Sequence, residues 1–251
     1  MPGISGPHVE VGIGIMMIVF CGVALALMAL LWPAAVLAQP ARIILLRHAE
    51  KLNHRELCEV GEQRAEALAQ QYLGQGATQS LFSSGEKPNA FLAITAHTIE
   101  TITPAAESWD SPVTVYKLHG KHEDGGEKEE ELIRRTQEAG RDVLNDPRYD
   151  GKTIVIAWEH NHIAKAKLEK DNPGEEVTFR QLLGLDRVLN VPETWPDSNY
   201  DYFWIADYVP GNPVPIRFQM VRQVFTAPFA GLPANAWDEP EPEHLDAGCK
   251  K

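Results

Sequence analysis

Residues 41–51 read ARIILLRHAEK, a short run of β-branched residues and leucines that ends in an Arg-His pair. A continuous apolar run of this length is typical of a strand that is buried on both faces of a sheet. Residues 153–158, TIVIAW, have the same character and are followed by Glu159 and His160. The sequence therefore predicts two buried strands, each with a histidine just beyond its carboxyl end.

The rest of the chain alternates between helical and strand patterns. We expect helices at 61–73, 93–109, 127–144, 162–169 and 178–183, and further strands at 80–83 and 113–116. Residues 202–208 and 214–225 predict a hairpin, because a Pro-Gly-Asn-Pro turn at 210–213 joins them. Alternation of this kind indicates an α/β domain with a largely parallel sheet.

The composition limits the partners and the chemistry. The chain has 251 residues and a formal net charge of −12, which fits one large domain or two small ones. An acidic surplus argues against a nucleic-acid partner, because phosphate backbones require a surplus of Lys and Arg. Three cysteines without a CxxC pair form neither a disulfide framework nor a typical zinc site. Cys58 and Cys249 can pair in an oxidising compartment, and the sequence alone does not decide this.

The two ends of the chain differ from its middle. Residues 11–38 carry no charged side chain and exceed the ~20 residues that span a bilayer as a helix. We interpret residues 1–38 as a signal peptide cleaved before Gln39 or as an uncleaved membrane anchor, and both place the remainder outside the cytoplasm. A buried helix of a soluble domain is disfavoured, because so long an apolar run is hard to bury in a domain of this size. Residues 229–251, rich in Pro and Glu, predict a disordered tail.

The predicted strand ends carry the candidate chemistry. Ligands of open α/β sheets bind at the carboxyl ends of the strands, so we expect His48 and His160 to converge in one pocket. Arg47 suits an anionic substrate, because a guanidinium binds phosphate through paired hydrogen bonds. A neutral histidine can attack phosphorus and carry the phosphoryl group, which divides one difficult displacement into two easier ones. The pattern therefore favours phosphoryl transfer.

Three segments resemble the histidine phosphatase superfamily, the phosphoglycerate mutase-like proteins. They are LLRHAEK at 45–51, LCEVGEQRAEAL at 57–68 and IVIAWEH at 154–160, in the order and at the spacing of that family. The later Trp-Pro-Asp at 195–197 and Tyr-Asp-Tyr at 200–202 are similar to a divergent microbial branch. The resemblance implies a three-layer αβα sandwich with a mostly parallel central sheet, which we assign to residues 40–228.

The resemblance also implies roles for individual residues. His48 would be the phosphorylated nucleophile, Arg47 would bind phosphoryl oxygens, and His160 would stabilise charge in the transition state. The second phosphate-binding arginine of the family, four residues before Thr101, is His97 here. Loss of that charge-assisted hydrogen bond costs about 1.5–3 kcal/mol. A phosphate dianion would raise the pKa of His97, so the histidine is expected to replace the arginine in part, and better at acidic pH.

The general acid is open at this point. A leaving alkoxide needs a proton, and Glu123, Asp124 and Glu159 are the main candidates. Glu159 adjoins His160, but neighbours on a strand point to opposite faces, so Glu123 or Asp124 is favoured. Glu50 is also close in sequence to the nucleophile.

These observations support three hypotheses. The first is an extracytoplasmic phosphatase that hydrolyses a small phosphoester through phosphohistidine at His48, without a metal ion or another cofactor. The second is a non-catalytic phosphoester-binding or regulatory protein that keeps the pocket but has His97 in place of the arginine. The third is a scaffold attached to the membrane through residues 11–38, with the acidic loop and tail as its binding surface. The sequence specifies neither the substrate nor the oligomeric state.

Overall fold

The computed structural model describes residues 1–3, 39–120, 128–240 and 248–250. The chain divides into two compact units, Met1–Val36 and Leu37–Lys251, and the second unit holds the domain described here. Within the described ranges, no helix is both long and apolar enough to cross a membrane. Residues 11–38 lie outside those ranges, so the signal or anchor stays a prediction.

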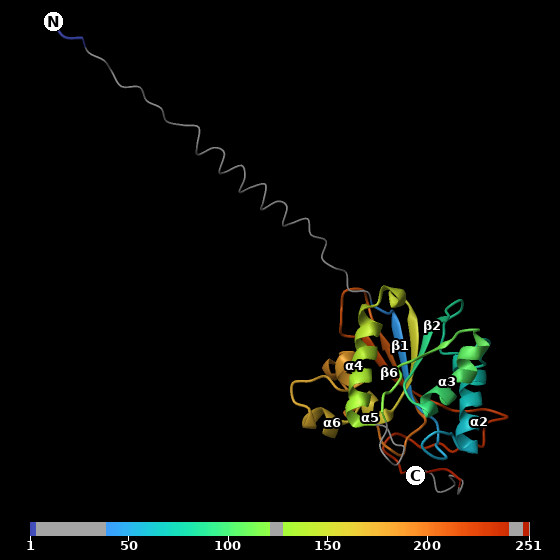
Figure 1. Ribbon diagram of the computed structural model, residues 1–251. Helices are drawn as coiled ribbons and strands as arrows, with labels where there is room; N and C mark the ends of the chain where they lie inside the picture. Colours follow the sequence, from blue (N-terminus) through green and yellow to red (C-terminus); the bar gives the residue numbers. More distant parts are fainter. Residues whose placement is uncertain (4–38, 121–127, 241–247, 251) are drawn as a thin grey trace. The chain divides into compact units, whose positions relative to one another are not determined.

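The domain is built on one six-stranded sheet in the order β3-β2-β4-β1-β5-β6 (Figure 1). Its strands are β1 (Arg42–Arg47), β2 (Pro88–Ala93), β3 (Val113–Val115), β4 (Thr153–Trp158), β5 (Tyr202–Asp207) and β6 (Arg217–Arg222). The first four strands of that order are parallel to one another. Strand β5 pairs with β1 in the antiparallel direction, and β5 and β6 form an antiparallel hairpin. The predicted, mostly parallel sheet and its terminal hairpin are confirmed.

Helices cover both faces of the sheet. In chain order they are α2 (Glu59–Leu68) with the π-helical turn Ala69–Leu73, α3 (Ala96–Ser108), α4 (Glu129–Asn145), the 3-10 turn Pro147–Tyr149, α5 (His160–Ile163), α6 (Ala166–Asp171), α7 (Phe179–Leu182) and the 3-10 turn Leu185–Arg187. Helices α2 and α3 lie on one face, and α4, α5 and α6 lie on the other (Figure 1).

The core is divided by the sheet into two apolar clusters. Alternate residues of β1 enter opposite clusters, as the period of a strand dictates: Ile44 packs with Leu68 of α2, and Ile43 packs in the cluster that contains Val143 of α4. The side chains of Ile43, Ile44, Leu68 and Val143 are fully or almost fully buried. The layers are therefore helix, sheet, helix, as the resemblance implied.

Two predicted elements are wrong. Residues 80–83 form a bend with irregular backbone instead of a strand, and the strand lies at Pro88–Ala93. Proline is tolerated at the first residue of a strand, and the apolar residues after it merge in the sequence with the following helix. The predicted helix at 162–169 is two short helices, because Ala164 and Lys165 adopt extended backbone angles between them.

The C-terminal tail packs against the domain over residues 229–240, which differs from the predicted disorder. The backbone amide of Asn235 donates to Oδ2 of Asp201 at 2.9 Å, and the Asn235 side chain is buried. The Trp237 ring lies 5.2 Å from that of Trp195, between centroids. Further along, Cys249 forms a disulfide with Cys58, 191 residues away. Residues 241–247 and 251 lie outside the described ranges.

Candidate active site

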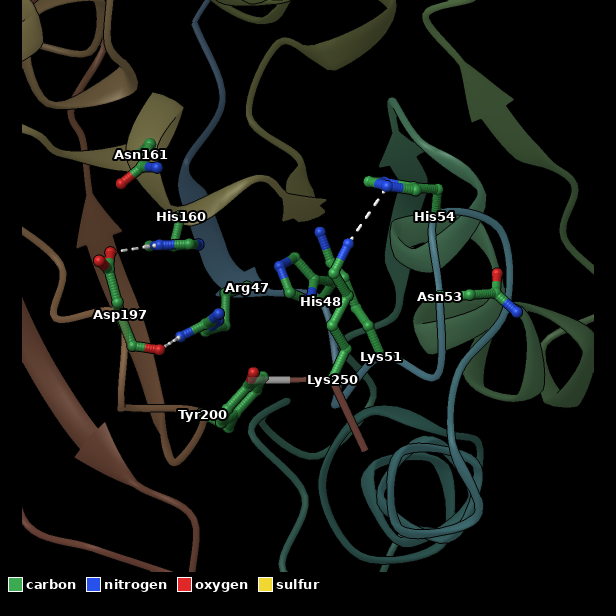
Figure 2. A pocket seen from close by; sticks show the side chains of 10 residues that line it. All are labelled: Arg47, His48, Lys51, Asn53, His54, His160, Asn161, Asp197, Tyr200 and Lys250. Atoms are coloured by element: carbon green, nitrogen blue, oxygen red, sulfur yellow. Dashed lines mark hydrogen bonds and ion pairs between the residues drawn. The ribbon is translucent and has the colours of Figure 1, made fainter. Parts of the chain in front are cut away.

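Strands β1 and β4 bring the two histidine segments together. Arg47 is paired with Trp158 in the parallel register, so His48 and His160 leave the sheet at adjoining strand ends. Their ring centroids are 5.9 Å apart. Both line a pocket of about 370 Å³ (Figure 2), whose ten lining residues are Arg47, His48, Lys51, Asn53, His54, His160, Asn161, Asp197, Tyr200 and Lys250. The structure therefore assembles Arg47, His48 and His160 in one pocket.

His48 is a buried, neutral imidazole. Its Nδ1 lies 2.7 Å from the carbonyl oxygen of Ala49, which can only accept a hydrogen bond, so Nδ1 carries the proton. Burial lowers the pKa of His48 well below its usual value, despite the opposing attraction of Glu159. Nε2 is left with a free lone pair, and no described residue hydrogen-bonds to it. This tautomer is the one that can attack phosphorus through Nε2.

The loop that carries His48 is held by helices α2 and α3. Oγ1 of Thr101 accepts a hydrogen bond from the backbone amide of Ala49 at 2.8 Å. Gly61 of α2 sits so close to the loop that a Cβ there would lie 2.2 Å from the carbonyl oxygen of Glu50. The glycine of the sequence motif is thus required for this contact, and the contact positions the nucleophile loop.

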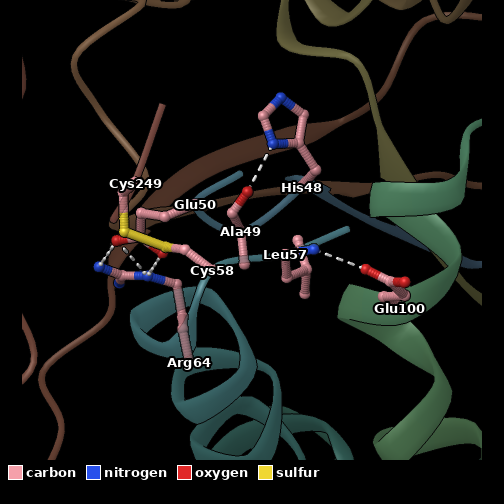
Figure 3. Close-up of a disulfide and its surroundings, with 8 residues drawn as sticks. All are labelled: His48, Ala49, Glu50, Leu57, Cys58, Arg64, Glu100 and Cys249. Atoms are coloured by element: carbon pink, nitrogen blue, oxygen red, sulfur yellow. Dashed lines mark hydrogen bonds and ion pairs between the residues drawn. A yellow bond between two sulfur atoms is a disulfide. The ribbon is translucent and has the colours of Figure 1, made fainter. Parts of the chain in front are cut away.

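Arg64, from the same motif, forms ion pairs with two buried acids. Its Nη2 is 2.6 Å from Oε1 of Glu50, and its Nη1 is 2.7 Å from Oδ1 of Asp201 (Figure 3 shows the Glu50 contact). All three side chains are about 2% exposed. Glu50 was one of the acids near the nucleophile in sequence. Its carboxylate is instead an ion-pair partner beneath the loop, which makes it a structural group.

Arg47 is oriented by main-chain carbonyls. Its Nη1 donates to the carbonyl oxygens of Asp197 at 2.7 Å and Asn199 at 3.0 Å. The guanidinium lies over the ring of Tyr200, 3.8 Å from its centroid. Nε is buried and has no hydrogen-bond partner among the described residues. The protein therefore fixes one edge of the guanidinium and leaves Nε able to donate to a bound anion.

His160 is paired with a carboxylate. Its Nε2 lies 2.8 Å from Oδ1 of Asp197, and this hydrogen bond, together with the nearby Lys165, holds the pKa of Asp197 well below its usual range. Burial, reinforced by the charge of Arg47, lowers the pKa of His160 to about 4. The neutral ring then donates from Nε2 and leaves Nδ1 as a buried lone pair. Asp197 is placed to stabilise the imidazolium that forms if Nδ1 takes a proton.

Glu159 points into the site, which corrects the expectation that it faces away from the histidines. The alternation of a strand ends with β4 at Trp158, and Glu159 is the residue before the first turn of α5. Its Oε2 lies 3.5 Å from Nε2 of His48 and 3.1 Å from Nζ of Lys51, and Oγ1 of Thr95 donates to its Oε1 at 2.7 Å.

These contacts keep the Glu159 carboxylate charged. Burial acts to raise its pKa, but the nearby His48 imidazole, the charge of Lys51 and the hydrogen bond from Thr95 outweigh burial and hold the pKa well below the usual value. Glu159 is therefore in its basic form at neutral pH. The other candidates, Glu123 and Asp124, lie outside the described residues, so their role stays a prediction.

His97 lies beside His48 but carries no fixed charge. Its ring centroid is 5.9 Å from that of His48, and its Nε2 lies 2.7 Å from the carbonyl oxygen of Asn53. Burial, with the charge of Lys51, lowers the pKa of His97 to about 4. This direction is opposite to the increase expected beside a phosphate dianion. At pH 7 the ring is neutral, so this side of the pocket lacks the positive charge that an arginine would supply.

Seven lining residues were not assigned a role from the sequence: Lys51, Asn53, His54, Asn161, Asp197, Tyr200 and Lys250. Three of them belong to segments that carry the resemblance, so their place in those motifs was an available signal. Lys250 has no such signal, because contacts between distant positions, the Cys58–Cys249 disulfide among them, hold it at the pocket.

The site also contains a set of potential metal ligands. His48, Glu159 and His160 each offer one ligand atom, and these atoms all lie within 4.8 Å of one another. A metal bound there through Nε2 of His48 would occupy the lone pair that the attack on phosphorus needs. The expectation of metal-independent chemistry stays a prediction.

Known proteins were compared with the chain. No protein-family model matches it, and neither does any curated protein. Among solved structures, the mycobacterial glucosyl-3-phosphoglycerate phosphatase Rv2419c is 15% identical, with 74% of this chain and 100% of that chain covered and a TM-score of 0.43. SixA from Agrobacterium tumefaciens, assigned as a phosphohistidine phosphatase, is 16% identical, with 72% and 97% covered and a TM-score of 0.37. Both are members of the superfamily that the sequence resembles. At these identities and TM-scores, the function is inferred from the site itself.

Proposed function

We propose that the protein is a phosphatase that hydrolyses a small phosphoester through a phosphohistidine intermediate on His48. The observation that carries the proposal is the free Nε2 lone pair of a buried, neutral His48 in a pocket with Arg47 and His160. A neutral imidazole is the reactive form, and the neighbouring guanidinium attracts the phosphoryl group.

In the first step, Nε2 of His48 forms a bond to phosphorus and the bond to the ester oxygen breaks. Arg47 binds the phosphoryl oxygens. The negative charge of the bound phosphoryl group raises the pKa of His160, which takes up a proton from solvent on Nδ1 and, supported by Asp197, donates to the phosphoryl oxygens. The departing alkoxide takes a proton and leaves as the alcohol. Glu159 supplies that proton after taking one up from solvent, because the negative charge of the bound phosphoryl group raises its pKa.

In the second step, water attacks phosphorus and the bond to Nε2 breaks. Glu159, 3.5 Å from Nε2, removes a proton from the attacking water. The products are inorganic phosphate and the original neutral His48. Neither step requires a metal ion, so we propose metal-independent hydrolysis.

We also propose that the protein acts outside the cytoplasm. The apolar run at 11–38 supports this location, and so does the Cys58–Cys249 disulfide, because such bonds persist in oxidising compartments.

The intermediate provides the direct test of the proposed function. The full chain is mixed with p-nitrophenyl phosphate, quenched in alkali, where a phosphoramidate survives, and digested for mass spectrometry. We expect a phosphate adduct on the peptide that contains His48. Turnover with no adduct at any quench time, or an adduct only on another residue, would contradict the proposal.

A second candidate function is a phosphoester-binding protein that does not turn over. The neutral His97 favours it, because this site has one fixed positive charge fewer than the resemblance implies. Such a protein would bind inorganic phosphate and release none from an ester.

Replacing His97 with arginine separates the two functions. We expect the H97R variant to raise kcat/KM at pH 7 by roughly tenfold, since a charge-assisted hydrogen bond contributes about 1.5–3 kcal/mol. The wild type should gain activity as the pH falls toward about 4, where His97 becomes charged, and H97R should show less of that gain. The measurement is a pH profile of p-nitrophenyl phosphate hydrolysis, with H97Q as the neutral control. Equal or lower activity of H97R at pH 7 would count against this assignment of His97.

A further inference from the structure

One side of the pocket is poorly supplied with free positive charge. In Figure 2, Arg47 lies on one side of His48 together with His160 and Asp197. On the other side, the Lys51 ammonium is 3.1 Å from the Glu159 carboxylate, so its charge is largely balanced. A phosphoryl dianion held at His48 therefore needs a further cation on the side of Lys51.

Lys250 supplies an ammonium group on that side. It lines the same pocket as His48, and Figure 2 shows it beside Lys51 and His54. Its Nζ lies 3.2 Å from Nε2 of His54. No described carboxylate forms an ion pair with Lys250, unlike Lys51. Its charge is therefore available to a ligand.

Two attachments hold the backbone of Lys250 to the nucleophile loop. The preceding residue, Cys249, is bonded to Cys58, whose amide donates to the carbonyl oxygen of Glu50 at 3.0 Å. The amide of Lys250 itself donates to the carbonyl oxygen of Lys51 at 2.6 Å. The backbone of Lys250 is thus held next to the loop that carries His48, by its own hydrogen bond to Lys51 and by the disulfide of Cys249.

We propose that Lys250 is a substrate-binding residue, which binds phosphoryl oxygens on the Lys51 side of the pocket and is positioned there by the Cys58–Cys249 disulfide. This inference rests on the proposed phosphatase function, because the ligand is the phosphoryl group that His48 attacks. It assigns a role in the site to a tail that lies 191 residues beyond its disulfide partner.

The first test is the K250Q variant of the full chain. We expect KM for p-nitrophenyl phosphate to rise about three- to tenfold with little change in kcat, because an exposed charge contributes uniform binding of modest size. The increase of KM with salt should also become weaker, since one screened charge is gone. The K250R variant should restore both properties. The control is K152Q, an exposed lysine just before the opposite end of β4, which should match the wild type.

The second test asks whether the disulfide acts through Lys250. The C249S variant should raise KM as K250Q does, and the double variant C249S/K250Q should be no worse than either single variant, because both changes remove one interaction. Additive effects would show that the disulfide acts independently of Lys250, and an unchanged KM and salt dependence in K250Q would overturn the proposal.

Calorimetric binding of inorganic phosphate separates this proposal from the proposed function. If the wild type binds phosphate and does not turn over, the phosphatase assignment fails, and weaker phosphate binding by K250Q still supports the role of Lys250. Equal phosphate binding by wild type and K250Q overturns that role whether or not the protein is active.

Discussion

Replacing His48 with alanine is expected to lower kcat for p-nitrophenyl phosphate by roughly 10⁴-fold or more, to the level of the uncatalysed background. The reason is that the alanine removes the one atom, Nε2, that forms the bond to phosphorus in the proposed mechanism. Arg47 and His160 would still bind the phosphoryl group, so inorganic phosphate should continue to bind. The measurement is nitrophenolate release by the full chain, with phosphate binding followed in parallel.

A matched control is available in the same region of the fold. His162 of α5 is as buried as His48, with a side chain about 2% exposed, but its Nε2 faces Glu129 at 3.3 Å and does not line the pocket. The H162A variant removes an imidazole of equal burial together with its contact to Glu129, so it reports a loss of packing and polar contact outside the pocket. If H48A kept more than about a tenth of the wild-type kcat, His48 would not be the nucleophile.

Replacing Glu159 with glutamine is expected to lower kcat by roughly 10²- to 10⁴-fold, the range typical of a lost general acid or base. Nitrophenolate is a good leaving group that departs without a proton, so the first step should survive the change. The second step loses the base that activates water. Phosphorylated His48 should therefore accumulate, visible as a burst of nitrophenolate close to one per site, followed by slow release.

The control for this variant is E169Q. Glu169 has the same side-chain exposure as Glu159, 14%, and is also paired with a cation, Arg180, but its ion pair lies away from His48. A loss of kcat in E159Q without a burst would mean that Glu159 acts in the first step only. An unchanged kcat would place the acid–base group elsewhere, with Glu123 and Asp124 as the next variants.

Much of the fold could be predicted because its strands are short apolar runs. The β1 and β4 segments are buried on both faces, and their sequences contain little else. The position of β2 was missed, because its apolar residues run on through Ile94 to Thr95, the N-cap of α3, and were assigned to the start of the helix. The break between α5 and α6 carries no proline or glycine, so the sequence did not reveal it.

The site residues that follow directly from a strand end could be predicted. The residues that distant segments bring to the site could not. Arg47, His48 and His160 follow from their strands. Glu159 was misplaced because the rule of alternation was applied one residue beyond the strand. Lys250 depends on a disulfide between distant positions, which no local pattern specifies.

The position of β1 has a consequence for how the protein reaches its active form. This strand is the first of the sheet to be synthesised, yet it lies between β4 and β5, and Arg42 bonds Asp207 across a separation of 165 residues. Contacts so distant in sequence form late and slowly during folding. The parallel half of the sheet and the terminal hairpin meet only through β1, so the second edge of the strand that carries the nucleophile is covered only when the hairpin has been made. A chain that stops before β5 would leave β1 with an open edge, exposed to pairing with other chains.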